Sequence, residues 1–299
     1  MEGEVAFIEA LRALATTPGA RGLNDDAALL TLGREVLVVT HDTMVEGVHW
    51  LPGQDAADVA FKLVASNLSD LAAKGCKPLG VMLSYMLGDA DANARFVAGL
   101  GEALAQFKTP LLGGDTVGNG ESPVRSVGIT ALGRPVRNPP PSRADAKPGQ
   151  DLHVTGTIGA ALAGFEALQS GDTGEASAPY RRPLPLIEEG RKLARLAGAM
   201  MDVSDGLLLD AFRMAEASGT TIAIDAETVP VPGALSQRRG EAMRWGDDYQ
   251  LLFTLDPGTV PPVPATRIGK VMARGDAPLL VDDAPLREPA DLGYRHEAG

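Results

Sequence analysis

The chain has 299 residues, of which 44% are hydrophobic and 22% are charged, the composition of a globular protein long enough for two domains. Its net charge of -12 argues against a duplex nucleic acid partner, and it contains no apolar run of the roughly 20 residues that a membrane span requires. Cys76 is the only cysteine, which excludes an intrachain disulfide and, together with an acidic N-terminus unlike that of a signal peptide, predicts a cytoplasmic location.

The first half alternates predicted helices with predicted strands. In chain order, hydrophobic spacing predicts a helix over 5–14, a strand over 36–39, a helix over 55–74, a strand over 79–87, a helix over 91–107, a short strand from 110 that runs into a glycine pair, and a strand over 124–132. This order is typical of an α/β or α+β layer.

Two polar residues interrupt the apolar face of the helix predicted over 55–74. Asn67 falls inside the apolar arc, and Asp70 falls between Val59 and Leu63 on the same face. Because a buried carboxylate without a partner is costly, Asp70 needs a cation or hydrogen-bond donors. The pattern indicates either a metal- or nucleotide-binding role or a buried structural hydrogen bond.

The clearest change in composition lies at 134–149, where three consecutive prolines, 139–141, exclude a helix and favour an extended linker. We place the domain boundary here, with one domain over 1–137 and a second over 138–299. The second half is predicted to contain strands over 151–155, 221–224, 267–272 and 278–281, a strand directly after Asp248, and helices over 160–168, 185–196 and 207–217.

Gly156 and Gly159, just before the helix predicted from residue 160, are a weak phosphate-binding signal. Close packing of helix against strand explains the two glycines equally well. The chain lacks a Gly-Lys-Ser/Thr motif, which argues against a Walker-type nucleotide site.

Acidic residues recur where the predicted strands begin or end. They are Asp25, Asp26, Asp42, Asp115, Asp202, Asp205, Asp247 and Asp248. Neighbouring carboxylates repel one another unless a cation lies between them, and oxygen ligands are those that Mg²⁺ prefers. Together with Asp70, the set indicates Mg²⁺ that bridges an anionic substrate and a nucleotide. Taken singly, each residue also fits a solvated turn, and Ser204 or Asp205 fits a helix cap.

A series of short motifs follows in order along nearly the whole chain. They are Asn24–Ala28, Asp42–His49, Asn67–Ala73, Gly113–Thr116, Lys147–Gly149, Val154–Gly156, Asp202–Gly206 and Gly246–Tyr249. On these motifs the chain resembles the thiamine-monophosphate kinases, a family in the aminoimidazole ribonucleotide synthetase superfamily. The resemblance implies an α/β fold of two domains, in which an N-terminal mixed sheet dimerises through its strands and a C-terminal α/β sandwich follows. ATP is then expected between the domains, near the dimer interface.

The resemblance also implies roles for particular residues. Several Mg²⁺ ions would be held by Asp26, Thr40, His41 (through its backbone carbonyl), Asp42, Asp70, Asp115, Asp202 and Asp205, of which Asp42 and Asp70 are the expected catalytic residues. ATP would contact Gly114, Asp115, Arg143 and Ser204, and thiamine monophosphate would contact His49, Asp247 and Tyr294. The chain departs from the family pattern at Asn24, His41, Asp247 and Gln250, where the family usually has Gly, Thr or Ser, Glu and Glu.

The implied activity is ATP-dependent phosphorylation of thiamine monophosphate to thiamine diphosphate by direct in-line transfer, with Mg²⁺ required and a homodimer as the working form. Two alternatives stay open. A sister-family synthetase would release ADP and free phosphate, and a non-catalytic nucleotide-binding maturation scaffold would give no turnover. The related maturation scaffolds depend on a C-terminal cysteine, which this chain lacks. No nucleic acid or membrane partner is expected.

Overall fold

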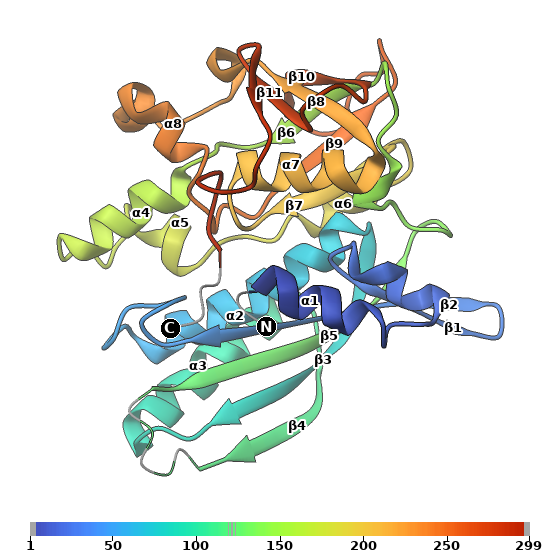
Figure 1. Cartoon of the computed structure of the whole chain (residues 1–299). Coiled ribbons are helices and arrows are strands. Elements are labelled where there is room, and N and C mark those ends of the chain that lie inside the picture. Colours follow the sequence, from blue (N-terminus) through green and yellow to red (C-terminus); the bar gives the residue numbers. More distant parts are fainter. Residues whose placement is uncertain (1–3, 119, 121, 123, 296–299) are drawn as a thin grey trace.

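Two β-sheets, with the long helix α2 (Ala56–Ala73) between them, organise the chain (Figure 1). The computed structural model describes residues 4–118, 120, 122 and 124–295. The first half of the chain forms the five-stranded sheet and the second half forms the seven-stranded sheet. Among the helices of these residues, none combines the length and the apolar character needed to cross a bilayer.

The N-terminal sheet is mixed. Its strands are β1 (Ala28–Leu32), β2 (Glu35–Val45), β3 (Cys76–Met86), β4 (Leu111–Val117) and β5 (Ser126–Pro135), in the order β1-β2-β5-β3-β4. Strands β3 and β4 run parallel, and the other neighbours are antiparallel. Helices α2 and α3 (Ala90–Gln106) pack together on one face of this sheet, and α1 (Glu4–Arg12) contacts the 3₁₀ segment Pro18–Leu23 (Figure 1).

Helix α2 is buried along its whole length, because it packs against the N-terminal sheet and against β7 and α6 of the second half. Asp55 begins the helix, where its side chain accepts a hydrogen bond from the backbone N–H of Ala57. The helix ends at Lys74, and Gly75 follows with a φ of 63°, which glycine adopts without strain. Polar side chains on α2 therefore lie inside the protein and need partners there.

The C-terminal sheet is also mixed and has the order β12-β11-β8-β10-β6-β9-β7. Its strands are β6 (Asp151–Thr155), β7 (Met200–Val203), β8 (Thr220–Ile224), β9 (Gln250–Leu255), β10 (Ala265–Ala273), β11 (Leu279–Val281) and β12 (Ala284–Leu286). The helices of this half are α4 (Ala160–Gln169), α5 (Ala178–Arg181), α6 (Ile187–Leu193), α7 (Leu207–Ser218) and α8 (Arg239–Ala242), and the 3₁₀ segments are Arg143–Asp145, Ala226–Thr228 and Gly233–Arg238.

The predicted α/β architecture of mixed sheets and helices is confirmed, with two local corrections. Asp42 does not follow a strand but lies within β2, because β2 stays paired with β5 as far as Val45. Gly114 and Asp115 likewise lie within β4, paired with Leu83 and Ser84 of β3, rather than at the end of a strand.

Candidate active site

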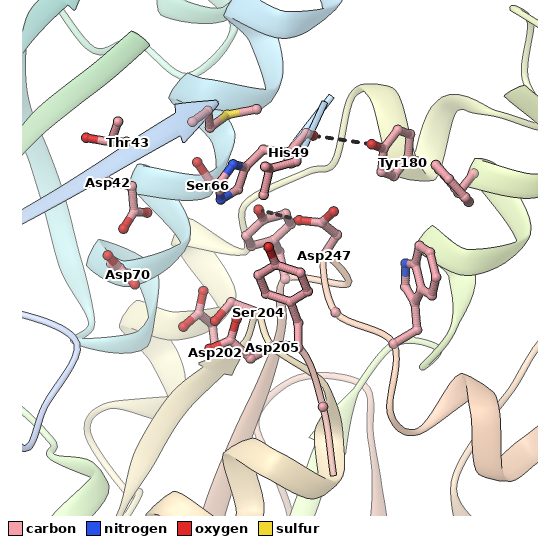
Figure 2. Close-up of a pocket in the computed structure, with 18 of the residues that line it drawn as sticks. Asp42, Thr43, His49, Ser66, Asp70, Tyr180, Asp202, Ser204, Asp205 and Asp247 are labelled. Carbon is pink, nitrogen blue, oxygen red and sulfur yellow. Dashed lines mark hydrogen bonds between the residues drawn. The ribbon is translucent and has the colours of Figure 1, made fainter. Parts of the chain in front are cut away.

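A cavity of about 510 Å³ opens between the two halves of the chain. It is lined by β2, α2, the β7–α7 connection, the loop before β9 and the C-terminal segment around Tyr294. Figure 2 shows Asp42, Asp70, Asp202 and Asp205 toward one end, and His49, Tyr180 and Asp247 toward the other. Residues far apart in the sequence thus form an acidic end and an aromatic end of one cavity.

Hydrogen bonds from neighbouring side chains hold the acidic end. The backbone N–H of Asp42 donates to Oδ1 of Asn67 at 3.0 Å, which fixes β2 against α2. The hydroxyl of Thr40 donates to Oδ2 of Asp70. The hydroxyl of Ser69 donates to Oδ2 of Asp202 at 2.6 Å, so α2 also orients the acid at the end of β7.

The electrostatics of this end favour a cation. Burial, together with the charge of Asp205, raises the pKa of Asp42 to about 6. Burial likewise raises the pKa of Asp202 to about 6, and that of Asp70 lies well above its ordinary range because of burial and the charges of Asp42 and Asp202. Hard oxygen donors that repel one another fit Mg²⁺ by their chemistry. Within the described part of the chain, no three acidic or imidazole groups already surround one point at metal-binding distance.

Asp210, which is not among the predicted site residues, holds the connection between β7 and α7 in place. Asp210, fully buried in α7, accepts hydrogen bonds from the backbone N–H groups of Ser204 and Asp205, both at 3.1 Å. Gly206 occupies the N-cap position of α7 without a side-chain cap, so the helix-cap interpretation of Ser204 and Asp205 is wrong. The Asp205 carboxylate instead pairs with Arg213.

Asp26 and Arg143 meet in a salt-bridge cluster that is not among the residues lining the cavity. The Lys74 ammonium lies 2.6 Å from Oδ2 of Asp26 and also donates to Asp25, which pairs in turn with Arg21. Lys74 was missed because a lysine at a helix end ordinarily faces solvent. The available signal was its spacing of four residues from Asp70, which places both on the same face of α2.

Four aromatic residues missing from the sequence prediction line the other end of the cavity: Phe165, Tyr180, Trp245 and Tyr249. The Phe165 ring packs against the rings of Tyr180 and Trp245, with centroids 5.1 and 5.0 Å apart. Tyr294 also lines the cavity, and its backbone N–H donates to the carbonyl of Asp205 at 2.8 Å. Phe165, Tyr180 and Trp245 come from separate segments of the second half, so no local pattern links them.

Asp247 lies at the aromatic end and has both carboxylate oxygens engaged. Oδ1 accepts a hydrogen bond from the Tyr249 hydroxyl at 2.9 Å, and Oδ2 accepts one from the Lys62 ammonium at 2.8 Å. Its loop packs tightly on the β7–α7 connection, because a Cβ at Gly246 would lie 2.2 Å from the Ser204 carbonyl oxygen. His49 lines the same end, and its Nδ1 accepts a hydrogen bond from the backbone N–H of Val45.

Gly114, Asp115 and His41, like Asp26, Thr40 and Arg143, are predicted site residues that are not among those lining the cavity. Gly114 and Asp115 lie on β4, an edge strand separated from β2 by β5 and β3. Three strand spacings place β4 about 14 Å from β2. The imidazole of His41 lies on the exposed side of β2, within hydrogen-bonding distance of Thr130 and Thr43.

The glycines before α4 do not form a phosphate site. The backbone N–H groups of Gly159 and Ala161 donate to the carboxylate of Asp248 at 2.6 and 3.0 Å. A buried acid from the loop before β9 thus already accepts from the first amides of α4. A Cβ at Gly156 would lie 2.2 Å from the Gln250 side chain, and one at Gly159 would lie 2.6 Å from the Ala242 side chain, so both glycines permit close packing.

Comparison with known proteins decides the family. Models described as AIR synthase related protein, N-terminal and C-terminal domain, match residues 24–134 and 147–277. The thiamine-monophosphate kinase of Escherichia coli K12 is 35% identical over 306 residues, covering 93% of this chain and 92% of that protein. The chain belongs to the thiamine-monophosphate kinase family.

Solved structures of the family share the fold over almost the whole chain. The structure described as AaThiL complexed with AMPPCP and TMP is 27% identical and superposes with a TM-score of 0.87, covering 98% of this chain and 97% of that one. The thiamine-monophosphate kinase from Stenotrophomonas maltophilia K279a is 34% identical, with a TM-score of 0.76 and coverage of 94% and 96%. The sequence-based resemblance to thiamine-monophosphate kinases is confirmed.

Proposed function

We propose that this protein transfers the γ-phosphoryl group of ATP to the phosphate of thiamine monophosphate, giving thiamine diphosphate and ADP. The observation that carries the proposal is that one cavity has both a carboxylate-lined end and an aromatic end. The first suits a metal–phosphate assembly and the second suits the two rings of thiamine. Membership of the kinase family, and the likeness to a relative complexed with an ATP analogue and TMP, support the assignment.

The residues of the acidic end would position charge for the transfer. We propose that Asp42, Asp70, Asp202 and Asp205, with Thr40, bind Mg²⁺ at this end. When bound, Mg²⁺ would neutralise charge between the donor and acceptor phosphates. The acceptor is already an anion, so the chain needs to orient it rather than remove a proton from it. Asp42 and Asp70 are the proposed catalytic residues because they come from two elements that converge on this end.

The remaining roles follow the same arrangement. Ser204 and Arg143 would contact the phosphates of ATP, and Asp26 would add a carboxylate once Arg143 turns toward them. At the aromatic end of the cavity, His49, Asp247 and Tyr294 would contact thiamine monophosphate. We keep the backbone carbonyl of His41 as a proposed metal ligand, since its side chain faces the other way.

We further propose a homodimer in which β4 of one subunit completes the site of the other. Gly114 and Asp115 lie too far from Asp42 to act in the same subunit, but all of β4 is exposed. Apolar side chains such as Leu30, Met82 and Leu112 are also exposed on this sheet. Pairing of such surfaces would bury them, as dimer interfaces do. The domain boundary at 137/138 and a cytoplasmic location complete the proposal.

A coupled assay for ADP tests the activity. We expect ADP to form with Mg-ATP and thiamine monophosphate, but not with thiamine, which lacks the acceptor phosphate. Equal ADP formation with both compounds, or with neither, would contradict the proposal.

A further inference from the structure

Lys62 is a fully buried cation beside the aromatic end of the cavity. It lies in the middle of α2, and its side chain is 1% exposed. A buried ammonium is costly unless it is paired, and burial lowers the pKa of Lys62, an effect that the charge of Asp247 opposes. Lys62 does not itself line the cavity, yet its partners do.

Three partners surround the ammonium. Nζ donates to Oδ2 of Asp247 at 2.8 Å and to the backbone carbonyl of His49 at 3.0 Å. It also lies 3.9 Å from the centroid of the Tyr180 ring, a cation–π contact. An ammonium has three N–H donors, so these partners use its full capacity and leave none for a ligand.

The partners come from three separate segments that face the cavity. His49 belongs to the connection between β2 and α2, Tyr180 to α5, and Asp247 to the loop before β9. Two of these segments are also linked directly, because the Tyr180 hydroxyl donates to the His49 carbonyl at 3.3 Å (Figure 2). Lys62 therefore joins the N-terminal half to two segments of the C-terminal half at one point.

The contact with Lys62 also changes what Asp247 offers a ligand. Asp247 has a φ of 65°, a left-handed conformation that needs support from its surroundings. With Lys62 on one oxygen and the Tyr249 hydroxyl on the other, the carboxylate is fixed in orientation and its charge is balanced. Each oxygen keeps a further lone pair, so Asp247 can still accept a hydrogen bond in a defined direction.

We propose that Lys62 is the positioning residue of the thiamine pocket, which fixes Asp247, the His49 carbonyl and the Tyr180 ring in the arrangement that recognises the rings of thiamine monophosphate. This inference rests on the proposed function and adds a residue that determines substrate affinity without touching substrate. If the Lys62–Asp247 ion pair were purely structural, its loss would lower folding stability without a specific loss of substrate affinity.

The test compares Lys62→Met and Lys62→Arg with the matched control Arg182→Gln. Arg182 pairs with Asp58 and Glu102 between the same two halves of the chain, but does not line the cavity. Binding of thiamine monophosphate is followed through tryptophan fluorescence, because Trp245 lines the cavity while the other tryptophan, Trp50, is buried elsewhere. Thermal unfolding and the KM for ATP are measured on the same samples.

For Lys62→Met we expect the Kd and KM for thiamine monophosphate to rise by about 10- to 100-fold, since a misplacement of about 1 Å can cost that much. The KM for ATP should stay within about twofold, because the acidic end is held by other residues. Lys62→Arg keeps the charge but cannot place its planar donors on all three partners, so it should also bind the substrate more weakly. Arg182→Gln should lose stability without losing substrate affinity.

The outcomes separate the two proposals. Unchanged affinity for thiamine monophosphate in either folded Lys62 variant, or an equal loss in Arg182→Gln, would overturn the positioning role. If Lys62→Met does not fold, Lys62→Arg alone decides. Failure of the wild-type protein to bind thiamine monophosphate would instead overturn the proposed function.

Discussion

The Lys74 ammonium lies 2.6 Å from Oδ2 of Asp26, and these two side chains are 0% and 5% exposed. Asp25 accepts from the same ammonium, and Arg21 and Arg143 pair with Asp25 and Asp26, so three cations surround two adjacent acids. Repulsion between these carboxylates is thus relieved by the chain itself. The geometry of Asp25 and Asp26 consequently does not depend on a bound metal ion.

Lys74→Met should therefore make this region depend on Mg²⁺. Removing one partner of a buried ion pair costs about 3–5 kcal/mol, and added Mg²⁺ should restore part of that loss by taking the place of the ammonium. Thermal unfolding with and without Mg²⁺ measures both effects. Lys77→Met, at an exposed position of β3, is the control. An equal response to Mg²⁺ in Lys74→Met and the control would count against this account.

Asp42→Asn should abolish most turnover while leaving the fold intact. The carboxylate is expected to bind Mg²⁺, and loss of one such electrostatic group lowers kcat by about 10²–10³-fold. Because the substitution also removes a repelling charge, the metal-free variant should be at least as stable as the wild type. Steady-state kinetics and thermal unfolding check the two statements, and near-normal kcat would refute the metal assignment.

Stabilisation by Mg²⁺ should increase with pH. The pKa values of Asp42 and Asp202 are raised by burial from 3.8 to about 6. The folded, metal-free protein therefore favours the neutral form of both carboxyl groups. The stability that this form contributes is fully present below pH 3.8 and is lost as the pH rises through about 6. Mg²⁺ binds the ionised form, so the shift in melting temperature on adding Mg²⁺ should be larger at about pH 7.5 than at about pH 5. Equal shifts at both values would contradict the acidic end as the metal site.

Complementation tests the contribution of Asp115 from a second subunit. Asp42→Asn and Asp115→Asn should each be inactive alone. In a re-equilibrated equal mixture, half of the dimers are mixed and each contains one intact site, so about one quarter of wild-type activity should return. Sites built within a single subunit would recover no activity.

Local patterns in the sequence predicted the elements of the fold and the acidic residues, but not the contacts between distant segments. The burial of Asn67 and Asp70 could be predicted because helical periodicity places them on the apolar face of α2. Lys62 and Asp247 are 185 residues apart, and no local pattern links them. The position of Asp42 within β2 depended on pairing with β5, which periodicity does not reveal.

The aromatic end of the cavity could not be predicted either, because its residues are also distant in the sequence. Phe165, Tyr180 and Trp245 lie on three separate segments that meet only in the folded protein. Each is also an ordinary core residue by composition. Only the fold of the second half distinguishes a cavity lining from a core in these positions.

Phosphorus NMR of the purified protein with Mg-ATP and thiamine monophosphate follows the proposed transfer of the γ-phosphoryl group directly. We expect new diphosphate resonances matching thiamine diphosphate, with ADP formed in equal amount. ADP accompanied by free phosphate that depends on some other added substrate would contradict it and indicate a synthetase of the sister group. Tight binding of Mg-ATP without turnover would contradict it as well, and would indicate a nucleotide-binding scaffold.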